Sequence, residues 1–377
     1  MDELEHYATS PELFAEWQEL EKRMLDGYRL GAHLQGPAPA AAAERDAELR
    51  RVVVEAIAKK ESLANRNLTG VDLSGLDLSG ADLRGALMES ASFAGARLER
   101  TRLDDCVLAH ARFDGAELSG ASFVGANLGS ASFAEVRGGA PVDLRKANLW
   151  KASLAGASLT HANLEEASLW EADLSRADLS HATLSSASFY RTQLLGARFS
   201  GAVMRACIFL EVDVQEVDFG GACLDEAVFL SSRGDRARFV NARMTSLRLV
   251  HGCSFPEADF QGACLERANL RATVLARADF SGALLGKADL SESDLEGARF
   301  YRAVARDSLF LKARLKGAFM VSADLMGALL QKADLRGVDL RGSNLYGADF
   351  ALVRSDAGTN VTDAIQHKVR TVPRRPA

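Results

Sequence analysis

Residues 81–85 read Ala81-Asp82-Leu83-Arg84-Gly85, and this five-residue unit returns along most of the chain. The Leu position of the unit, which we call the centre, holds Leu or Phe at nearly every fifth residue in three runs. Of the 57 centres, 34 are Leu, 16 are Phe and 4 are Met. The phase slips by one residue between the runs, which extend from Leu63 to Phe133, from Leu144 to Leu249 and from Phe255 to Phe350.

A period of five fits neither common element, because a helix buries residues at spacings of three and four and a strand at a spacing of two. It fits a chain that turns a corner every five residues. The residue two before the centre is Ala in 38 of the 57 units. Side chains alternate along a short extended segment, so the centre and this small residue both point inward. Four such sides close a square coil of 20 residues.

The unit resembles the A(D/N)LXX repeat of the pentapeptide-repeat protein family. The resemblance implies an all-β fold, a right-handed quadrilateral β-helix of about 14 coils and roughly 70 Å in length. We expect three parts: an N-terminal helical extension and cap in residues 1–60, the β-helix in residues 61–352, and a short basic tail in residues 353–377. Further units that carry the resemblance are Ala147-Asn148-Leu149, Ala172-Asp173-Leu174, Ala258-Asp259-Phe260 and Ala333-Asp334-Leu335.

The Phe centres predict aromatic columns inside the coil. If each phase slip is absorbed by one bulged or looped residue, every centre falls on one of four faces. Three Phe residues then share one face, and six others share the opposite face in successive coils. We predict stacked rings in this section and Leu columns elsewhere. The three are Phe189, Phe209 and Phe229, and the six are Phe199, Phe219, Phe239, Phe260, Phe280 and Phe300.

Three irregular segments are candidates for added function. Residues 134–143, which include Arg137 and Gly138, and residues 250–257, which include His251, carry the phase slips. The third segment is residues 231–235, in which Gly234 occupies a centre, and this suggests a local kink or bulge. Each segment is interpreted either as a tolerated defect of a long solenoid or as a docking loop.

Charge is locally segregated between residues 211 and 248. An acidic group is followed one coil later by a basic group. Because adjacent coils lie about 4.8 Å apart, the two groups can pair across the ladder. The alternative is an acidic binding patch. The candidate residues are Glu211, Asp213, Glu216 and Asp218, followed by Arg233 and Arg236.

Residues 1–60 do not repeat and predict two helices. Ser10-Pro11 is a typical helix start, and the helix should run to about Leu30. Its apolar stripe includes Phe14 and Trp17, which serve either for packing or for binding a partner or a second copy of the chain. The second helix, about residues 43–60, should cover the open first coil, because exposed strand edges recruit other chains.

Composition and motifs argue against an enzyme and predict no cofactor or metal. The sequence holds no zinc-protease, P-loop, nucleophile-elbow or dinucleotide-binding motif. His161 and His181 lie 20 residues apart, so they share a column, and we interpret this as coil spacing rather than a two-histidine metal site. The net charge of −6 argues against nucleic-acid binding, and no apolar run is long enough to span a membrane. The five cysteines and the absence of a signal peptide predict a reducing cytoplasm.

These observations favour a non-enzymatic scaffold or adaptor that presents flat β-helix faces to a protein partner. The resemblance suggests a bacterial protein, located in the cytoplasm with non-classical secretion left open, in association with a secretion system or its effectors. One alternative is a DNA-mimicking gyrase binder, which the nearly balanced charge of the repeats disfavours. Another is an effector whose activity resides in the N-terminal extension. A homodimer through the N-terminal helices is also consistent with the sequence.

Overall fold

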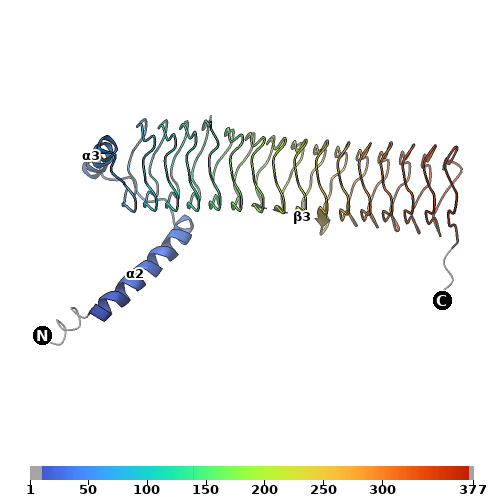
Figure 1. Ribbon diagram of the computed structural model, residues 1–377, viewed down its shortest axis with the longest axis horizontal. Helices are drawn as coiled ribbons and strands as arrows, with labels where there is room; N and C mark the ends of the chain where they lie inside the picture. Colours follow the sequence, from blue (N-terminus) through green and yellow to red (C-terminus); the bar gives the residue numbers. More distant parts are fainter. Residues whose placement is uncertain (1–10, 139, 373–377) are drawn as a thin grey trace.

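The computed structural model describes residues 11–138 and 140–372 and shows a rod of stacked coils with helices at one end (Figure 1). Outward residues of successive coils pair in parallel at a spacing of 20 residues, as in Asp72 with Ser92. We number the four sides of the rod by the first outward residue that pairs on each: Asn67 on face 1, Asp72 on face 2, Asp77 on face 3 and Asp82 on face 4. The square coil predicted from the period is therefore confirmed.

Few residues form regular elements, because each side of a coil contributes only one or a few ladder positions. The helices are α2 (Pro11–Gly31), the short 3-10 helix η1 (Ala32–Leu34) and α3 (Ala43–Lys59). The strands are β1 (Ser188–Tyr190), β2 (Ile208–Leu210), β3 (Val228–Leu230) and β4 (Arg248–Val250), which pair in parallel in that order on face 1. Among the described residues, no helix has the length and apolar character to cross a membrane.

The interior follows the predicted arrangement of one large and one small side chain on each side of a coil. The centres and the small residues form one continuous buried core along the rod. Where the small residue is polar, it donates a hydrogen bond to an earlier carbonyl. Cys106 Sγ lies 3.0 Å from the carbonyl oxygen of Leu83, and Thr192 Oγ1 lies 2.7 Å from that of Leu169. A small donor is thus satisfied inside the apolar core.

The predicted Phe columns are confirmed. On face 3, the six rings from Phe199 to Phe300 stack with centroid separations of 4.8–5.3 Å. On face 1, Phe209 stacks on Phe189 at 4.6 Å and on Phe229 at 4.3 Å. The expectation of Leu columns elsewhere is wrong, because a third stack lies on face 2 nearer the N-terminus. It comprises Phe93, Phe113 and Phe133, at 4.8 Å per step.

Gly234 causes no kink, contrary to the prediction from its position at a centre. Its neighbour Arg233 continues the face 2 ladder, paired with Asp213 and Ser254. A Cβ at Gly234 would lie 2.5 Å from the Phe255 ring and 2.7 Å from Val214. The large ring in the next coil therefore fills the space that a side chain at residue 234 would otherwise occupy.

The ladder accommodates three one-residue slips, of which two were predicted. The second slip places consecutive left-handed residues, His251 and Gly252, at φ 55° and 76°. The third lies between Arg354 and Asn360, and pairing then continues to Arg370. The boundary expected at residue 352 is therefore too early. The sequence signal is lost because the last coil has no coil beyond it, so an exposed polar residue, Gln366, stands where a buried Leu would otherwise be required.

Helix α3 covers the open N-terminal end of the rod. Val53 is fully buried and belongs to the same core as the first centres. Polar side chains of α3 complete the backbone hydrogen bonds of the first coil. The Asp46 carboxylate accepts from the backbone N–H of Asp72 at 2.7 Å, and Arg50 donates to the Asp72 carbonyl at 2.6 Å. The exposed edge of the first coil is thereby blocked.

Candidate functional site

An apolar strip runs along face 1 over six successive coils. The residue that follows the centre is large and apolar in each coil, and its side chain lies at the surface. Trp170 is 48% exposed, and Ile208, on the outward side of β2, is 50% exposed. We define the strip as Trp150, Trp170, Tyr190, Leu210, Leu230 and Val250, together with the outward residues Ile208 and Val228 of β2 and β3.

The strip has an ordered polar margin. Trp170 Nε1 donates to Ser188 Oγ at 2.9 Å, and the Trp170 ring meets the Tyr190 ring edge to face at 5.8 Å. The Arg191 guanidinium lies over the Tyr190 ring at 4.9 Å and forms an ion pair with Glu211 at 2.7 Å. The aromatic side chains are therefore held in place although they face solvent.

The N-terminal helices are anchored on the same face, directly before the strip. Asn127 Nδ2 donates to the Arg29 carbonyl at 2.8 Å, and His33 packs edge to face against Trp150 at 5.2 Å. A Cβ at Gly129 would collide with the His33 side chain, so only glycine permits this close approach. Buried Ala32 rests on Val107 beneath η1. The strip is thus continuous with the contact between the N-terminal helices and face 1 of the rod.

His33 is held as a neutral acceptor. Its Nδ1 lies 3.1 Å from the side-chain amide nitrogens of both Asn127 and Asn148. The orientation of these amides is set by the backbone, because each Oδ1 accepts from an N–H two residues later, in Gly129 and Trp150. Burial lowers the pKa of His33, which is consistent with an unprotonated Nδ1.

A second contact ties the last turns of α2 to the first coils. The Tyr28 hydroxyl donates to the Glu89 carboxylate, which is buried and also accepts from Thr69 Oγ1 at 2.9 Å. Burial, followed by this hydrogen bond to Glu89, raises the pKa of Tyr28 to about 12. Tyr28 therefore stays a neutral donor over the physiological pH range.

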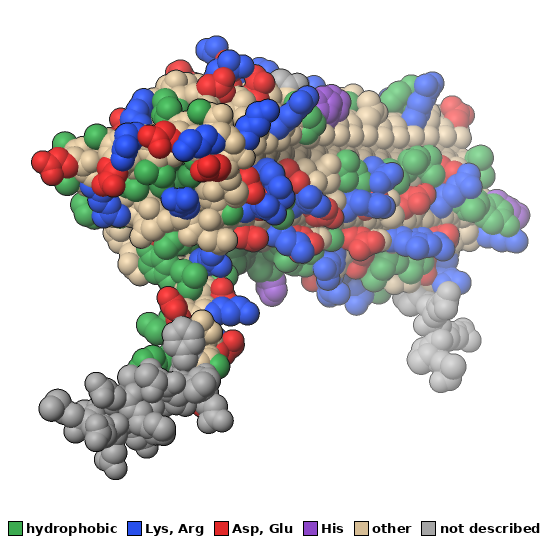
Figure 2. Space-filling model, turned by 60° about the vertical axis from the view of Figure 1, so that its left-hand side comes forward, with side chains coloured by type: hydrophobic (Ala, Val, Ile, Leu, Met, Phe, Trp, Pro, Cys, Tyr) green, Lys and Arg blue, Asp and Glu red, His purple; other side chains and the backbone are tan. Residues whose placement is uncertain are grey.

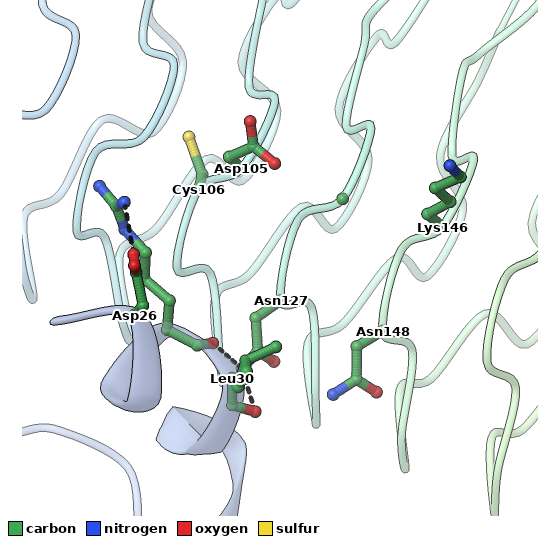
Figure 3. A pocket seen from close by; sticks show the side chains of 9 residues that line it. Asp26, Leu30, Asp105, Cys106, Asn127, Lys146 and Asn148 are labelled. Atoms are coloured by element: carbon green, nitrogen blue, oxygen red, sulfur yellow. Dashed lines mark hydrogen bonds and ion pairs between the residues drawn. The ribbon is translucent and has the colours of Figure 1, made fainter. Parts of the chain in front are cut away.

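A cavity of about 440 Å³ lies between the end of α2 and the rod. Figure 3 shows Leu30 of α2 beside Asn127 on face 1, with Asp26 to the left of this pair and Lys146 in a later coil. Asn127 is occupied in binding the helix backbone, and Cys106 points into the core, where burial raises the pKa of its thiol to about 12. This cavity serves as a joint between helix and rod and brings together no nucleophile and base.

Helix α2 leaves this joint and projects away from the rod (Figure 1). The described residues of its apolar stripe are largely exposed to solvent. Trp17 is 58% exposed, Leu20 is 49% exposed and Met24 is 68% exposed. Trp17 is therefore available for binding, as one of the two alternatives from the sequence requires. The side chain of Phe14 lies outside the described residues.

The predicted acidic and basic groups neutralise each other across the coils. Figure 2 shows basic and acidic side chains interspersed along the visible flank. The acidic candidates form no free patch, although their role in binding stays a prediction. The pairs are Arg191–Glu211 at 2.7 Å, Arg233–Asp213 at 2.8 Å, Arg236–Glu216 at 2.7 Å and Arg238–Asp218 at 4.0 Å.

The two loop candidates fall in different surroundings. Arg137 is exposed and pairs with Glu117 on face 3, and Gly138 follows it at the first slip. His251 is exposed at a corner of the last strip coil, one residue after Val250. Of the loop candidates, His251 borders the strip, whereas Arg137 and Gly138 do not.

The described residues show no cluster of three or more metal-binding side chains. His161 and His181 stack at 5.2 Å, as expected from coil spacing. The cysteines are unpaired thiols, and Cys223 lies 2.9 Å from an Arg243 guanidinium nitrogen. These contacts stabilise the coil surface, and nothing in their arrangement builds a binding site for a cofactor.

Sequence reasoning missed the apolar strip. Its signal is present, because the six residues from Trp150 to Val250 are spaced by 20 residues. The five-residue period hides it, since only one side in four carries the apolar residue. Reading the sequence in blocks of 20 would have found it.

The family model for pentapeptide repeats matches eight segments of the chain. This match, together with the parallel coils, confirms the right-handed quadrilateral β-helix that the repeats predict. The matched segments are residues 67–105, 101–137, 142–169, 172–209, 253–291, 273–310, 283–320 and 323–353.

Several solved structures that are similar to the chain are pentapeptide-repeat proteins. Full-length QnrB1, a plasmid-mediated fluoroquinolone resistance protein, is 19% identical over 56% of this chain and 90% of its own, with a TM-score of 0.30. HetL, involved in heterocyst differentiation regulation in the cyanobacterium Nostoc, is 22% identical over 84% of this chain and 92% of its own, with a TM-score of 0.16. Rfr23 from the cyanobacterium Cyanothece is 30% identical over 29% of this chain and 63% of its own, with a TM-score of 0.15. No curated protein sequence matches the chain.

Proposed function

Because the chain belongs to the pentapeptide-repeat family, we propose that it is a non-enzymatic scaffold that binds a protein through the apolar strip of face 1. The observation that carries this proposal is the strip itself. Folding gives no reason to place Trp170 and Ile208 half-exposed on the same flat face. A contiguous exposed apolar surface marks an interaction site in a soluble protein.

The composition of the strip favours a protein partner. Trp and Tyr are enriched in the residues that dominate binding energy at protein interfaces. The strip combines an apolar centre with a charged margin, in which Arg191 and Glu211 flank Tyr190. An apolar centre with a polar rim is the usual anatomy of such an interface.

The DNA-mimicking alternative requires an acidic surface that continues along the rod. Face 3 has no such continuous acidic surface over four successive coils, where the outward residues alternate in charge. These residues are Arg198, Asp218, Arg238 and Asp259. Most acidic groups of the predicted band are neutralised by arginines one coil away. Inhibition of gyrase supercoiling by the purified protein at stoichiometric concentration would overturn this preference.

The second alternative places an activity in the N-terminal extension. The described residues of that segment have structural roles instead: α3 covers the core, and Tyr28 and His33 anchor α2. These roles favour the scaffold. Association with a bacterial secretion system and a cytoplasmic location stay predictions, which identification of the partner will test.

Site-specific photo-crosslinking in cells tests the proposal. A photoreactive phenylalanine analogue replaces Tyr190 in the strip or, as the matched control, Phe319, an aromatic residue that is 52% exposed on face 3. We expect a discrete crosslinked protein from position 190 and none from position 319. No crosslink from position 190, or the same pattern from both positions, would refute the strip as the binding surface.

A further inference from the structure

The chain carries two exposed apolar surfaces: the strip of face 1, whose first residue Trp150 is in contact with His33, and the stripe of α2. We propose that α2 of a second copy lies on the strip, and that two copies exchange these helices reciprocally. This inference rests on the proposed function, because it names the partner of the same surface.

The two surfaces match in pitch, and the whole helix is longer than the strip. The strip spans six coils, or five steps of about 4.8 Å, which is roughly 24 Å. The 21 residues of α2 extend over about 32 Å, and its apolar side chains recur at a pitch of about 5.4 Å. A helix that lies along the rod therefore places successive apolar side chains near successive coils, and the span from Trp17 to Met24, about 10 Å, covers two steps of the strip. Trp17, Leu20 and Met24 supply this stripe.

The direction of α2 explains why the helix lies on the strip of a second copy and not on the strip of its own chain. Both surfaces meet at the anchor formed by Asn127 and Trp150. From this anchor the strip runs toward the C-terminal end of the rod, past β3, whereas α2 points toward the N-terminal end (Figure 1). A two-fold axis near the anchor, perpendicular to the rod, places each helix over the other copy's strip. The resulting contact is isologous, as in most homodimers.

Charge is complementary in this arrangement. Glu16 and Glu21 lie on either side of the α2 stripe at helical spacing, and neither forms an ion pair with another described residue. Arg248 lies in the last coil of the strip and likewise forms none within the described part of the chain. The two-fold axis directs the N-terminal half of α2 to that end of the partner's strip. Glu16 and Arg248 can therefore pair between copies.

Light scattering of the purified full chain tests the dimer. We expect twice the chain mass of 40.5 kDa at micromolar concentration. Leu210→Glu in the strip and Trp17→Glu in α2 should each give the mass of a monomer with unchanged circular dichroism. Leu284→Glu, at a residue 41% exposed on face 4, and Glu19→Lys, on the far side of α2, are matched controls that should stay dimeric.

Mixing the two monomeric variants tests the exchange itself. A Leu210→Glu chain retains a normal helix and a Trp17→Glu chain retains a normal strip, so an equimolar mixture should recover part of the dimer. A dimer that survives Leu210→Glu would mean that two α2 helices pair with each other, and it would overturn the inference. A monomeric parent chain would overturn it as well. If position 190 still crosslinks another protein in cells, the proposed function stands while this inference fails.

Discussion

Phe239→Ala tests whether the aromatic column stabilises the rod as a rigid stack. The Phe239 ring is 1% exposed and lies between Phe219 and Phe260, each at a centroid separation of 5.0 Å and nearly parallel. Truncation of a buried Phe to Ala costs about 3–5 kcal/mol. It also removes two stacked pairs, each worth about 0.5–1.5 kcal/mol beyond burial.

The cost should lie toward the upper end of that range, because the cavity cannot close. The backbone N–H of Phe239 donates to the Asp259 carbonyl at 2.7 Å, and that of Phe219 donates to the Arg238 carbonyl at 2.8 Å. These ladder hydrogen bonds fix the spacing of the coils, so the rings of Phe219 and Phe260 cannot approach each other to fill the cavity. The cost of such a substitution depends on how far the site can collapse.

Urea unfolding followed by circular dichroism measures the total effect, with Phe319→Ala as the control. Phe319 undergoes the same chemical change at a position 52% exposed, where we expect a loss below about 1 kcal/mol. Hydrogen exchange should show reduced protection in the coils around residue 239 and little change in distant coils, since each coil contacts only its neighbours. Equal unfolding of the two variants, or a uniform loss of protection along the rod, would refute the argument.

Three further predictions concern the anchor and the thiols. Because burial lowers the pKa of His33, the contribution of His33 to the stability of the anchor is present above the unfolded pKa of about 6.5 and is lost as the pH falls through the lower folded pKa. Proteolytic cleavage of the 35–42 linker should therefore accelerate on acidification in the parent chain but not in His33→Gln, when the protease is active at neutral and acidic pH. Gly129→Ala should displace η1 and expose the same linker to protease at neutral pH. Gly286→Ala, which also follows a centre but lies on face 4 and would place its Cβ at an ordinary contact distance of 3.9 Å from Glu266, should not. Iodoacetamide at pH 8 should modify the partly exposed Cys223 and leave Cys106 intact, because burial raises the pKa of Cys106 to about 12, and mass spectrometry of the peptides measures both.

The sequence predicts the coil with high fidelity because the period acts on every residue. A phase that places Phe199 and Phe219 one coil apart also fixes their face, and the rings stack as expected. The boundaries of the two helices follow for a similar reason, since Pro11 at the first turn and the alanine run before residue 43 are local signals. These features depend on short-range geometry that a single sequence records directly.

Features that depend on contacts between coils were harder to predict. Gly234 appears as a defect in the period, but it complements Phe255 in the next coil. The final coil escaped notice because its exposed position removes the requirement for Leu, so Gln366 breaks the pattern without breaking the ladder. In each case the explanation lies in the next coil, which either supplies a large ring or is missing, and a five-residue pattern does not reach that far.

The apolar strip and the exposed stripe of α2 share a physical cause that folding alone does not supply. The β-helix core is complete without either surface, because the centres and small residues already fill the interior. Outward positions are free to be polar, and on faces 2 and 3 ion pairs such as Arg233–Asp213 occupy them. Apolar side chains that return at one outward position in six consecutive coils therefore stabilise something other than the monomer. An exposed helix anchored at the start of that strip, with a matching stripe, is the segment of this chain best suited to cover it.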